Sequence, residues 1–212
     1  MSDSSASAPA PGTGGPRSAG TRRAILEAAR TTFAARGYEQ TTIRAVAARA
    51  GVDASMVMRY FGSKAGLFTT AATAELQVPD LRAVPAGERG ERLVRVFVDR
   101  WEDAARDDEL ILLLRTAVTS ETVAAQLQAT MGQLITEPIA ALGEDDAAGR
   151  GAFITAQLLG LALCRYILHL EPLASLPADD VVATIAPSVQ RYLTEPSSAV
   201  ASMSLTSSRS TL

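Results

Sequence analysis

The chain has 212 residues, 47% of them hydrophobic, and a net charge of -3. This composition is ample for a packed core in one large or two small domains, which excludes a wholly disordered protein. A single cysteine, Cys164, excludes an internal disulfide, and no leader-like segment opens the sequence, so we expect a cytoplasmic protein.

The pattern of apolar residues favours helices nearly everywhere. No long run of Val, Ile and Thr alternates with a period of two, and most prolines fall between helical segments. The sequence therefore predicts an all-α protein. Residues 1–19 and 196–212 are rich in small and polar residues with little to bury, so we expect a disordered N-terminal tail and a disordered C-terminal tail.

The first predicted helix covers residues 21–36. Ile25, Ala28, Ala29 and Phe33 share one face of it, and Gly37 follows as a stop signal. A short second helix then begins after Thr41 or Thr42, either of which can cap it, and it ends at Gly51 because glycine readily takes the left-handed conformation of a helix end.

A third helix follows at once, over residues 54–61, with Asp53 as its N-cap. Val57, Tyr60 and Phe61 are expected to pack back onto the first two helices. Ser63 is placed to cap a further helix that starts at Lys64. Two helices joined at a steep angle by a short turn with glycine form a helix-turn-helix, which inserts its second helix into the major groove of DNA.

Charge is distributed unevenly along the chain. Residues 17–64 contain nine basic and three acidic side chains, a net of +6 in a chain whose total is -3. A basic end on an acidic body suits binding to a polyanion at one end only. The alternative reading is a solvated helical surface that happens to be rich in arginine.

The segment "GYEQTTIRAVAARAGVDASMVMRYFGSKAGLF" resembles the DNA-binding domain of the tetracycline-repressor (TetR-like) family of bacterial transcription regulators. The resemblance covers residues 21–68 and implies a DNA-binding domain over 20–68 and a larger helical domain over 69–195 for effector binding and dimerisation. Asp53 departs from the usual Ser of the family, and Met58 from the usual Tyr of the recognition helix.

A helix-turn-helix of this kind predicts two sets of DNA contacts. The N-terminal part of the recognition helix is expected near base edges, and the residues around it near phosphates. The base-edge set is Ala54, Ser55 and Met56, and the phosphate set is Thr42, Arg44, Met58, Arg59, Tyr60 and Lys64. Arg22 and Arg23 are further candidates for the DNA backbone or the minor groove.

Polar, bulky or soft residues interrupt the apolar helical runs of the second domain, and this mixture is typical of a ligand cavity. For each of them, packing with a satisfied polar end is the alternative. Pro138 either kinks its helix or ends it. The candidate ligand-binding residues are Trp101, Arg115, Met131, Gln157, Arg165 and Tyr166, with His169 beside them.

Residues 152–170 are apolar and long enough to span a bilayer. Gln157, Arg165 and His169 argue against a membrane helix, because central polar and charged groups are costly there. Residues 148–170 and 178–193 are instead expected to form a four-helix interface between two copies, which a charge at Leu161 or Val189 would dissociate. The alternative is that both helices close the core of one copy.

Catalysis finds little support in the sequence. One histidine and one cysteine exclude the common zinc spacings, and no glycine-rich phosphate loop is present, so no catalytic residue, metal site or cofactor is predicted. The predicted function is a repressor that binds a pseudo-palindromic DNA operator as a homodimer and is released by a small, mostly apolar effector. The alternatives are a helical protein-binding adaptor and an enzyme with an unrecognised active site.

Overall fold

The computed structural model describes residues 16–74, 76, 78–102, 107–143 and 145–195, and these residues form helices and loops without a strand. The all-α prediction is confirmed. The expected tails lie outside the described residues, apart from residues 16–19.

The N-terminal part, hereafter the head, contains α1 (Pro16–Gln40), α2 (Ile43–Ala50), α3 (Ala54–Phe61) and α4 (Lys64–Thr73). Helix α1 begins at Pro16, so residues 16–19 are helical although the sequence places them in the tail. Proline is compatible with a first helical turn because the amide it lacks has no partner there. Gly37 interrupts the helix near its end with a φ of 72°, at the stop that the sequence predicts.

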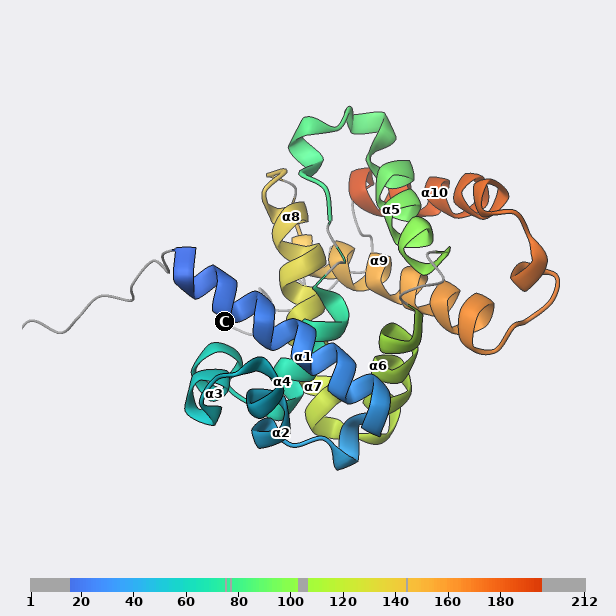
Figure 1. Cartoon of the computed structure of the whole chain (residues 1–212). Coiled ribbons are helices and arrows are strands. Elements are labelled where there is room, and N and C mark those ends of the chain that lie inside the picture. Colours follow the sequence, from blue (N-terminus) through green and yellow to red (C-terminus); the bar gives the residue numbers. More distant parts are fainter. Residues whose placement is uncertain (1–15, 75, 77, 103–106, 144, 196–212) are drawn as a thin grey trace, which may run out of the picture.

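The remaining helices form the body (Figure 1), in which α5 and α10 pack together and α6 and α7 contact the head. Short 3-10 turns cover Leu81–Ala83, Ala86–Glu88 and Leu173–Ser175, and π-helical segments cover Gly132–Thr136 and Leu163–Ile167. The body helices are α5 (Arg89–Glu102), α6 (Asp107–Thr119), α7 (Glu121–Met131), α8 (Glu137–Ala140), α9 (Ala147–Ala162) and α10 (Ala178–Thr194).

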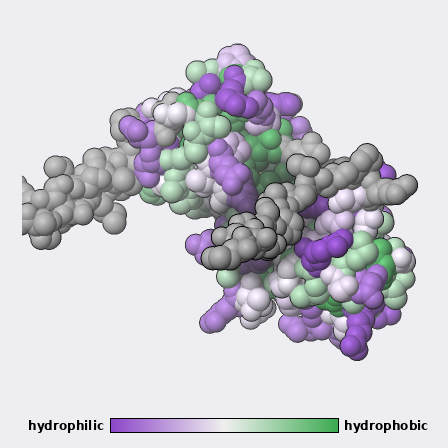
Figure 2. Space-filling view, turned by 90° about the vertical axis from the view of Figure 1, so that its left-hand side faces the viewer, coloured by the Kyte–Doolittle hydropathy of each residue, from purple (hydrophilic) through white to green (hydrophobic). Residues whose placement is uncertain are grey.

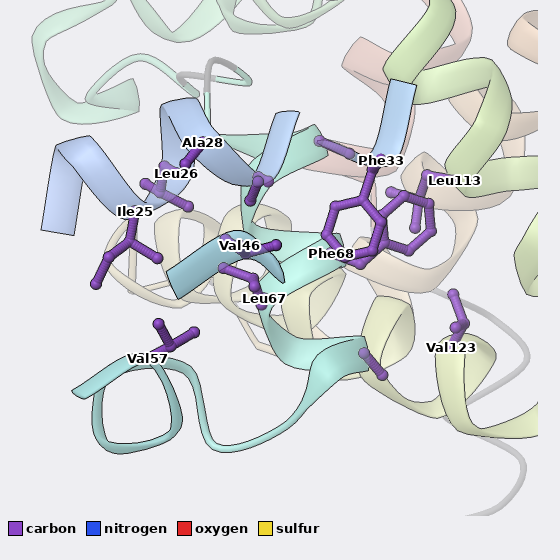
Figure 3. Close-up of a cluster of buried hydrophobic side chains, with 14 of the residues drawn as sticks. Ile25, Leu26, Ala28, Phe33, Val46, Val57, Leu67, Phe68, Leu113 and Val123 are labelled. Carbon is purple, nitrogen blue, oxygen red and sulfur yellow. The ribbon is translucent and has the colours of Figure 1, made fainter. Parts of the chain in front are cut away.

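The hydrophobic core of the head includes side chains of the body. The rings of Phe33 and Phe68 lie 4.7 Å apart between centroids, and the same buried cluster contains Leu113 of α6 together with Val123 and Leu127 of α7. Figure 3 shows Phe33 and Phe68 packed together with Leu113 beside them. The head therefore shares its core with α6 and α7, while the rest of the body has buried clusters of its own.

Pro138 does not end its helix. A regular α-helix would bring the proline ring against the carbonyl of Leu134. The chain instead passes from α7 into α8 through the π-helical segment, in which Glu137 donates its amide to the carbonyl of Gly132. Of the two alternatives, the structure has a distortion of a continuing helix.

In the part of the chain that the structure describes, one helical run of the body, Ala147–Ile167, is by length and composition long and apolar enough to cross a membrane, and about a third of its most apolar stretch is buried. On the face shown in Figure 2, hydrophilic residues interrupt the hydrophobic areas in both halves of the molecule.

Helices α5 and α10 meet at Gly90. The amide of Gly90 donates to Oε1 of Gln190 at 2.8 Å, and Nε2 of Gln190 donates to the carbonyl of Ala86 at 2.9 Å. The side chain of Gln190 thereby caps the start of α5. A Cβ atom on Gly90 would lie 2.6 Å from the backbone nitrogen of Gln190, so the close approach requires glycine.

We predict that Gly90→Ala destabilises the chain by about 1–3 kcal/mol, because the added methyl group forces α5 and α10 apart. Gly87→Ala is the matched control: a Cβ atom there meets nothing within 4 Å, so this variant should be neutral or slightly more stable. Urea unfolding of both variants measures the difference. Equal stability of the two variants would contradict the close helix crossing.

Candidate nucleic-acid interface and ligand cavity

The turn between α2 and α3 has the geometry that the sequence predicts. Gly51 takes the left-handed conformation, with φ 68° and ψ 31°, which favours glycine. The amide of Val52 donates to the carbonyl of Ala47 at 3.0 Å and so satisfies the end of α2. Only three residues separate the two helices, and both are anchored by fully buried valines, Val46 and Val57.

Capping side chains start the helices of the motif. Thr42 Oγ1 accepts the amide of Ala45 at 3.1 Å, Asp53 Oδ1 accepts that of Ser55 at 2.7 Å, and Ser63 Oγ accepts that of Gly66 at 2.9 Å. Of the two threonines considered for α2, Thr42 is the cap. Thr41 is buried and donates instead to the carbonyl of Gly37 at 2.7 Å.

Asp53, the N-cap of α3, adds a negative charge beside the predicted DNA contacts. Hydrogen bonding to Ser55 lowers the pKa of the carboxyl group of Asp53. A lowered pKa stabilises the fold above the unfolded value of about 3.9, and the contribution is lost as the pH falls through the folded value. At neutral pH, Asp53 is therefore an ionised cap, with its negative charge at the N-terminus of the recognition helix.

Helix α3 presents a mixed face to solvent. Ser55, Met58 and Arg59 are exposed, while Val57 on the opposite side is fully buried. Ala54, Met56 and Tyr60 are half-buried along the edges of this face. Of the three residues predicted at base edges, the exposed side of α3 thus carries Ser55, with Ala54 and Met56 at its edges, and Met58 adds an apolar side chain that is 43% exposed.

The residues predicted to contact phosphates differ in whether their side chains already interact with other parts of the chain. Arg44 is exposed at the start of α2. Lys64 Nζ donates to the carbonyl of Glu39 at 3.1 Å and lies 4.4 Å above the ring of Tyr38. The hydroxyl group of Tyr60 is hydrogen-bonded to Ser18 Oγ at 2.9 Å, which ties the start of α1 to the recognition helix.

Two arginines lie over aromatic rings near the same surface. The guanidinium of Arg59 is 5.4 Å from the ring centroid of Tyr60, and that of Arg22 is 5.5 Å from the ring centroid of Phe61. Arg23 is exposed on α1. These positions leave a basic, solvent-facing surface around α3.

A separate cavity of about 60 Å³ lies in the body, close to the head. Helices α5, α6, α7 and α9 and the end of α4 contribute its walls, and none of the described residues that line it is charged. The lining consists of Thr73, Leu76, Val78, Leu93, Val96, Phe97, Trp101, Leu110, Leu113, Leu114, Leu127, Met131, Leu134, Ile135, Thr155, Leu158 and Leu159.

Two of the predicted ligand-binding residues line this cavity, Trp101 and Met131. Arg115 is exposed, His169 is exposed with a φ of 50°, and Gln157 is half-buried on α9 outside the lining. Arg165 and Tyr166 also lie outside the lining, although Tyr166 stacks on Trp101 with centroids 5.0 Å apart.

The guanidinium of Arg165 is occupied by hydrogen bonds within the body. Its Nη2 atom donates to Glu102 Oε1 at 2.9 Å and to the carbonyl of Leu176 at 2.8 Å, and Nη1 donates to the carbonyl of Leu173. Burial lowers the pKa of Arg165, but the groups beside its guanidinium, first of all the hydrogen-bonded Glu102, outweigh this effect and raise the pKa. Its guanidinium therefore holds the loop before α10 and does not face the cavity.

The hydroxyl group of Tyr166 belongs to the same network. It donates to Glu102 Oε1 at 3.1 Å. Burial, and then the negative charge of Glu102, raise the pKa of Tyr166 well above its usual range. Tyr166 thus stays neutral, and its ring stacks on the indole of Trp101.

The polar residues that do line the cavity, Thr73 and Thr155, were missed by the sequence analysis. Both interrupt apolar helical runs, which is a weak signal because threonine is also a common surface residue. Phe97 was missed because an aromatic residue in an amphipathic helix reads as ordinary core.

Comparisons with known proteins agree with this geometry. Residues 25–71 match the family described as "Bacterial regulatory proteins, tetR family", and residues 87–193 match "Tetracyclin repressor-like, C-terminal domain". A solved TetR-family regulator from Streptomyces coelicolor A3 is 34% identical, with a TM-score of 0.66, and the match covers 87% of this chain and 100% of that one.

Two other solved structures share the fold at lower identity. A putative TetR-family transcriptional regulator from Rhodococcus sp. is 22% identical over 83% of this chain and 100% of its own, with a TM-score of 0.55. A putative transcriptional regulator from Pseudomonas aeruginosa PAO1 is 18% identical over 82% of this chain and 90% of its own, also with a TM-score of 0.55. Among curated proteins, no sequence matches.

The helix-turn-helix head and the helical body define a bacterial transcription regulator. The chain belongs to the TetR family. The family resemblance, the helix-turn-helix and the fold class expected from the sequence are confirmed.

Proposed function

We propose that the chain is a cytoplasmic, ligand-responsive repressor, which binds a pseudo-palindromic operator as a homodimer and leaves it when a small, mostly apolar effector binds. The observation that carries this proposal is the exposed face of α3. Ser55, Met58 and Arg59 face solvent from a helix whose other side is fixed by Val57 in the core. A rigidly held helix with an exposed polar and basic face suits insertion into a major groove.

The base-edge contacts fall to Ala54, Ser55 and Met56, since they form the first turn of α3. A serine hydroxyl both donates and accepts and so can pair with either type of base edge. Alanine and methionine supply apolar contact, which suits the methyl group of thymine.

The phosphate contacts fall to Thr42, Arg44, Met58, Arg59, Tyr60 and Lys64. Lys64 reaches a phosphate only by leaving the carbonyl of Glu39, and a charge-assisted bond to phosphate replaces that interaction. Met58 has no hydrogen-bond donor, so its contact with the DNA backbone is limited to packing against sugar atoms.

We predict that Arg44→Ala and Lys64→Ala each weaken binding to all DNA sequences alike and flatten the dependence of log K on log salt by about 0.9, the value for one phosphate contact. Arg92→Ala, a change to an exposed arginine of the body, is the control and should leave the slope unchanged. Fluorescence anisotropy on duplex DNA between low and moderate salt provides the measurement. Unchanged affinity in both head variants would remove this assignment.

Dimerisation is supported by the apolar surface of α9 and the segment after it. Phe153 and Leu163 are 47% and 44% exposed, and Ala156 and Gly160 on the same side are exposed as well. These positions repeat at intervals of three and four residues and therefore form one stripe along the helix. A second copy that buries this stripe, with α10 beside it, completes an isologous four-helix interface.

The positions suggested by the sequence for testing the dimer are unsuitable. Leu161 is only 4% exposed and Val189 is fully buried, both within the core of one copy, where α5, α9 and α10 meet. A charge at either residue would destabilise the fold of the monomer, because an unpaired charge is costly to bury. Its effect would not report on the interface.

We predict instead that Leu163→Glu converts the dimer to a monomer at micromolar concentration, since it places a charge in the apolar stripe. Val118→Glu is the matched control, because Val118 is 86% exposed on α6 and the same change there should leave a dimer. Sedimentation velocity distinguishes the two. A wild-type chain that sediments as a stable monomer would contradict the dimer and, with it, the spacing of two half-sites by about 34 to 36 Å or a multiple.

The effector is proposed to bind in the cavity lined by Trp101 and Met131. The apolar lining favours an apolar molecule, and α4 contributes Thr73 to the wall while also joining head to body. We expect α4 to have two positions, one that suits operator binding and one that does not. An effector that binds more tightly to the second weakens operator binding by the difference between its two binding free energies, typically about 1–3 kcal/mol.

The switch is tested by a thermal-shift screen of apolar metabolites and drugs, followed by operator binding with each hit. The operator itself is obtained by sequencing the genomic DNA fragments that the protein retains. We expect stabilising hits to release the operator. Hits that stabilise the protein and leave its affinity for DNA unchanged would disprove the switch and leave the DNA-binding proposal intact.

A further inference from the structure

The indole N–H of Trp101 is a buried donor without an acceptor. The side chain is 2% exposed, and Nε1 has no hydrogen-bond partner among the described residues. Buried tryptophan N–H groups usually find a partner, because leaving a donor unpaired away from water is unfavourable. The exception calls for an explanation.

The neighbours of Trp101 hold its ring in place. Tyr166 stacks on one face of the indole, nearly parallel at 9°, and Phe97 packs at 6.0 Å between ring centroids. The hydroxyl group of Tyr166 donates to Glu102 and does not accept the indole N–H of Trp101. Since one face is covered, Trp101 borders the cavity through its other face or its edge.

The cavity offers few other polar groups. Thr73 donates its hydroxyl proton to the carbonyl of Thr69 at 2.7 Å, so that proton is not available to a ligand. Thr155 is half-buried on the α9 wall. Among the described residues, the lining has no charged side chain that could compensate a charge on a ligand.

We propose that the effector is an uncharged, mostly apolar molecule with one hydrogen-bond acceptor of the carbonyl type, which accepts the indole N–H of Trp101. The inference rests on the proposed function only in assuming that the cavity takes a ligand. The acceptor satisfies the donor, and the apolar lining covers the rest of the molecule.

Binding requires the cavity to widen. Its volume of about 60 Å³ is below the roughly 150 Å³ of an engineered apolar cavity that holds benzene. Met131 is suited to yield, because it is an unbranched side chain with several rotatable bonds and lies next to the π-helical segment Gly132–Thr136.

The test uses three small probes on the full chain. Acetophenone and ethylbenzene have similar shapes and differ in a carbonyl oxygen, and benzoate carries a charge. Because Trp101 is the only tryptophan of the chain, its indole N–H gives a single nitrogen–proton NMR signal. We expect acetophenone to shift this signal downfield, ethylbenzene to shift it much less, and benzoate not to bind.

Trp101→Phe removes the donor and keeps an aromatic ring. The ratio of acetophenone affinity to ethylbenzene affinity should fall by about tenfold in this variant, the upper range for one neutral hydrogen bond. Using the ratio cancels the difference in hydration between the probes. Tyr166→Phe is the matched control: it removes a hydroxyl from the same ring stack and should leave the ratio unchanged.

An unchanged ratio in Trp101→Phe, or equal shifts of the indole signal with both neutral probes, would overturn the proposal. So would benzoate binding as tightly as acetophenone. Failure of all three probes to bind would overturn both this inference and the effector site. Binding with the expected ratio but without any change in DNA affinity would uphold the ligand chemistry and contradict only the switch.

Discussion

Phe33 and Phe68 pack against each other in a cluster that Leu113, Val123 and Leu127 of the body complete. A unit as small as the head has little apolar surface to bury and is only marginally stable by itself, so the side chains of the body add to its stability. An ion pair also joins head and body, since Arg30 of α1 pairs with Glu109 of α6 at 3.5 Å. Arg30 donates as well to the carbonyl of Ala71 in α4. The position of the recognition helix is therefore tied to α6 and α7.

The same two body helices also form walls of the cavity. Leu113 and Leu127 belong to the shared cluster and line the cavity as well. Close-packed interiors transmit displacement, because side chains there have few voids into which they can relax. A ligand that widens the cavity would therefore act on residues that also support the head, and this is the physical route by which the proposed effector would change DNA binding.

Local signals allowed the head to be predicted from the sequence. Gly51, Asp53 and Ser63 act through bonds within a few residues, so their roles follow from residue type and spacing. The ligand-binding candidates depended on long-range packing. In the sequence, Arg165 is a polar residue within an apolar helix, which suggested a ligand contact. In the structure its partners are Glu102 and carbonyls of the loop before α10. Helical periodicity does not reveal which neighbour a side chain meets. Leu161 and Val189 illustrate the same limit, because an apolar stripe does not tell whether its own chain or a second copy covers it.

The shared core is tested most directly by hydrogen exchange of the Leu127→Ala variant, a change in the body that removes side-chain atoms from the cluster. The account predicts that amide protection falls in α1 and α4 of the head together with α7, because truncating a buried leucine costs about 2–5 kcal/mol and the cluster opens as one unit. Protection that falls in α7 while α1 and α4 exchange as in the wild-type chain would show that the head is stabilised independently and would contradict the account.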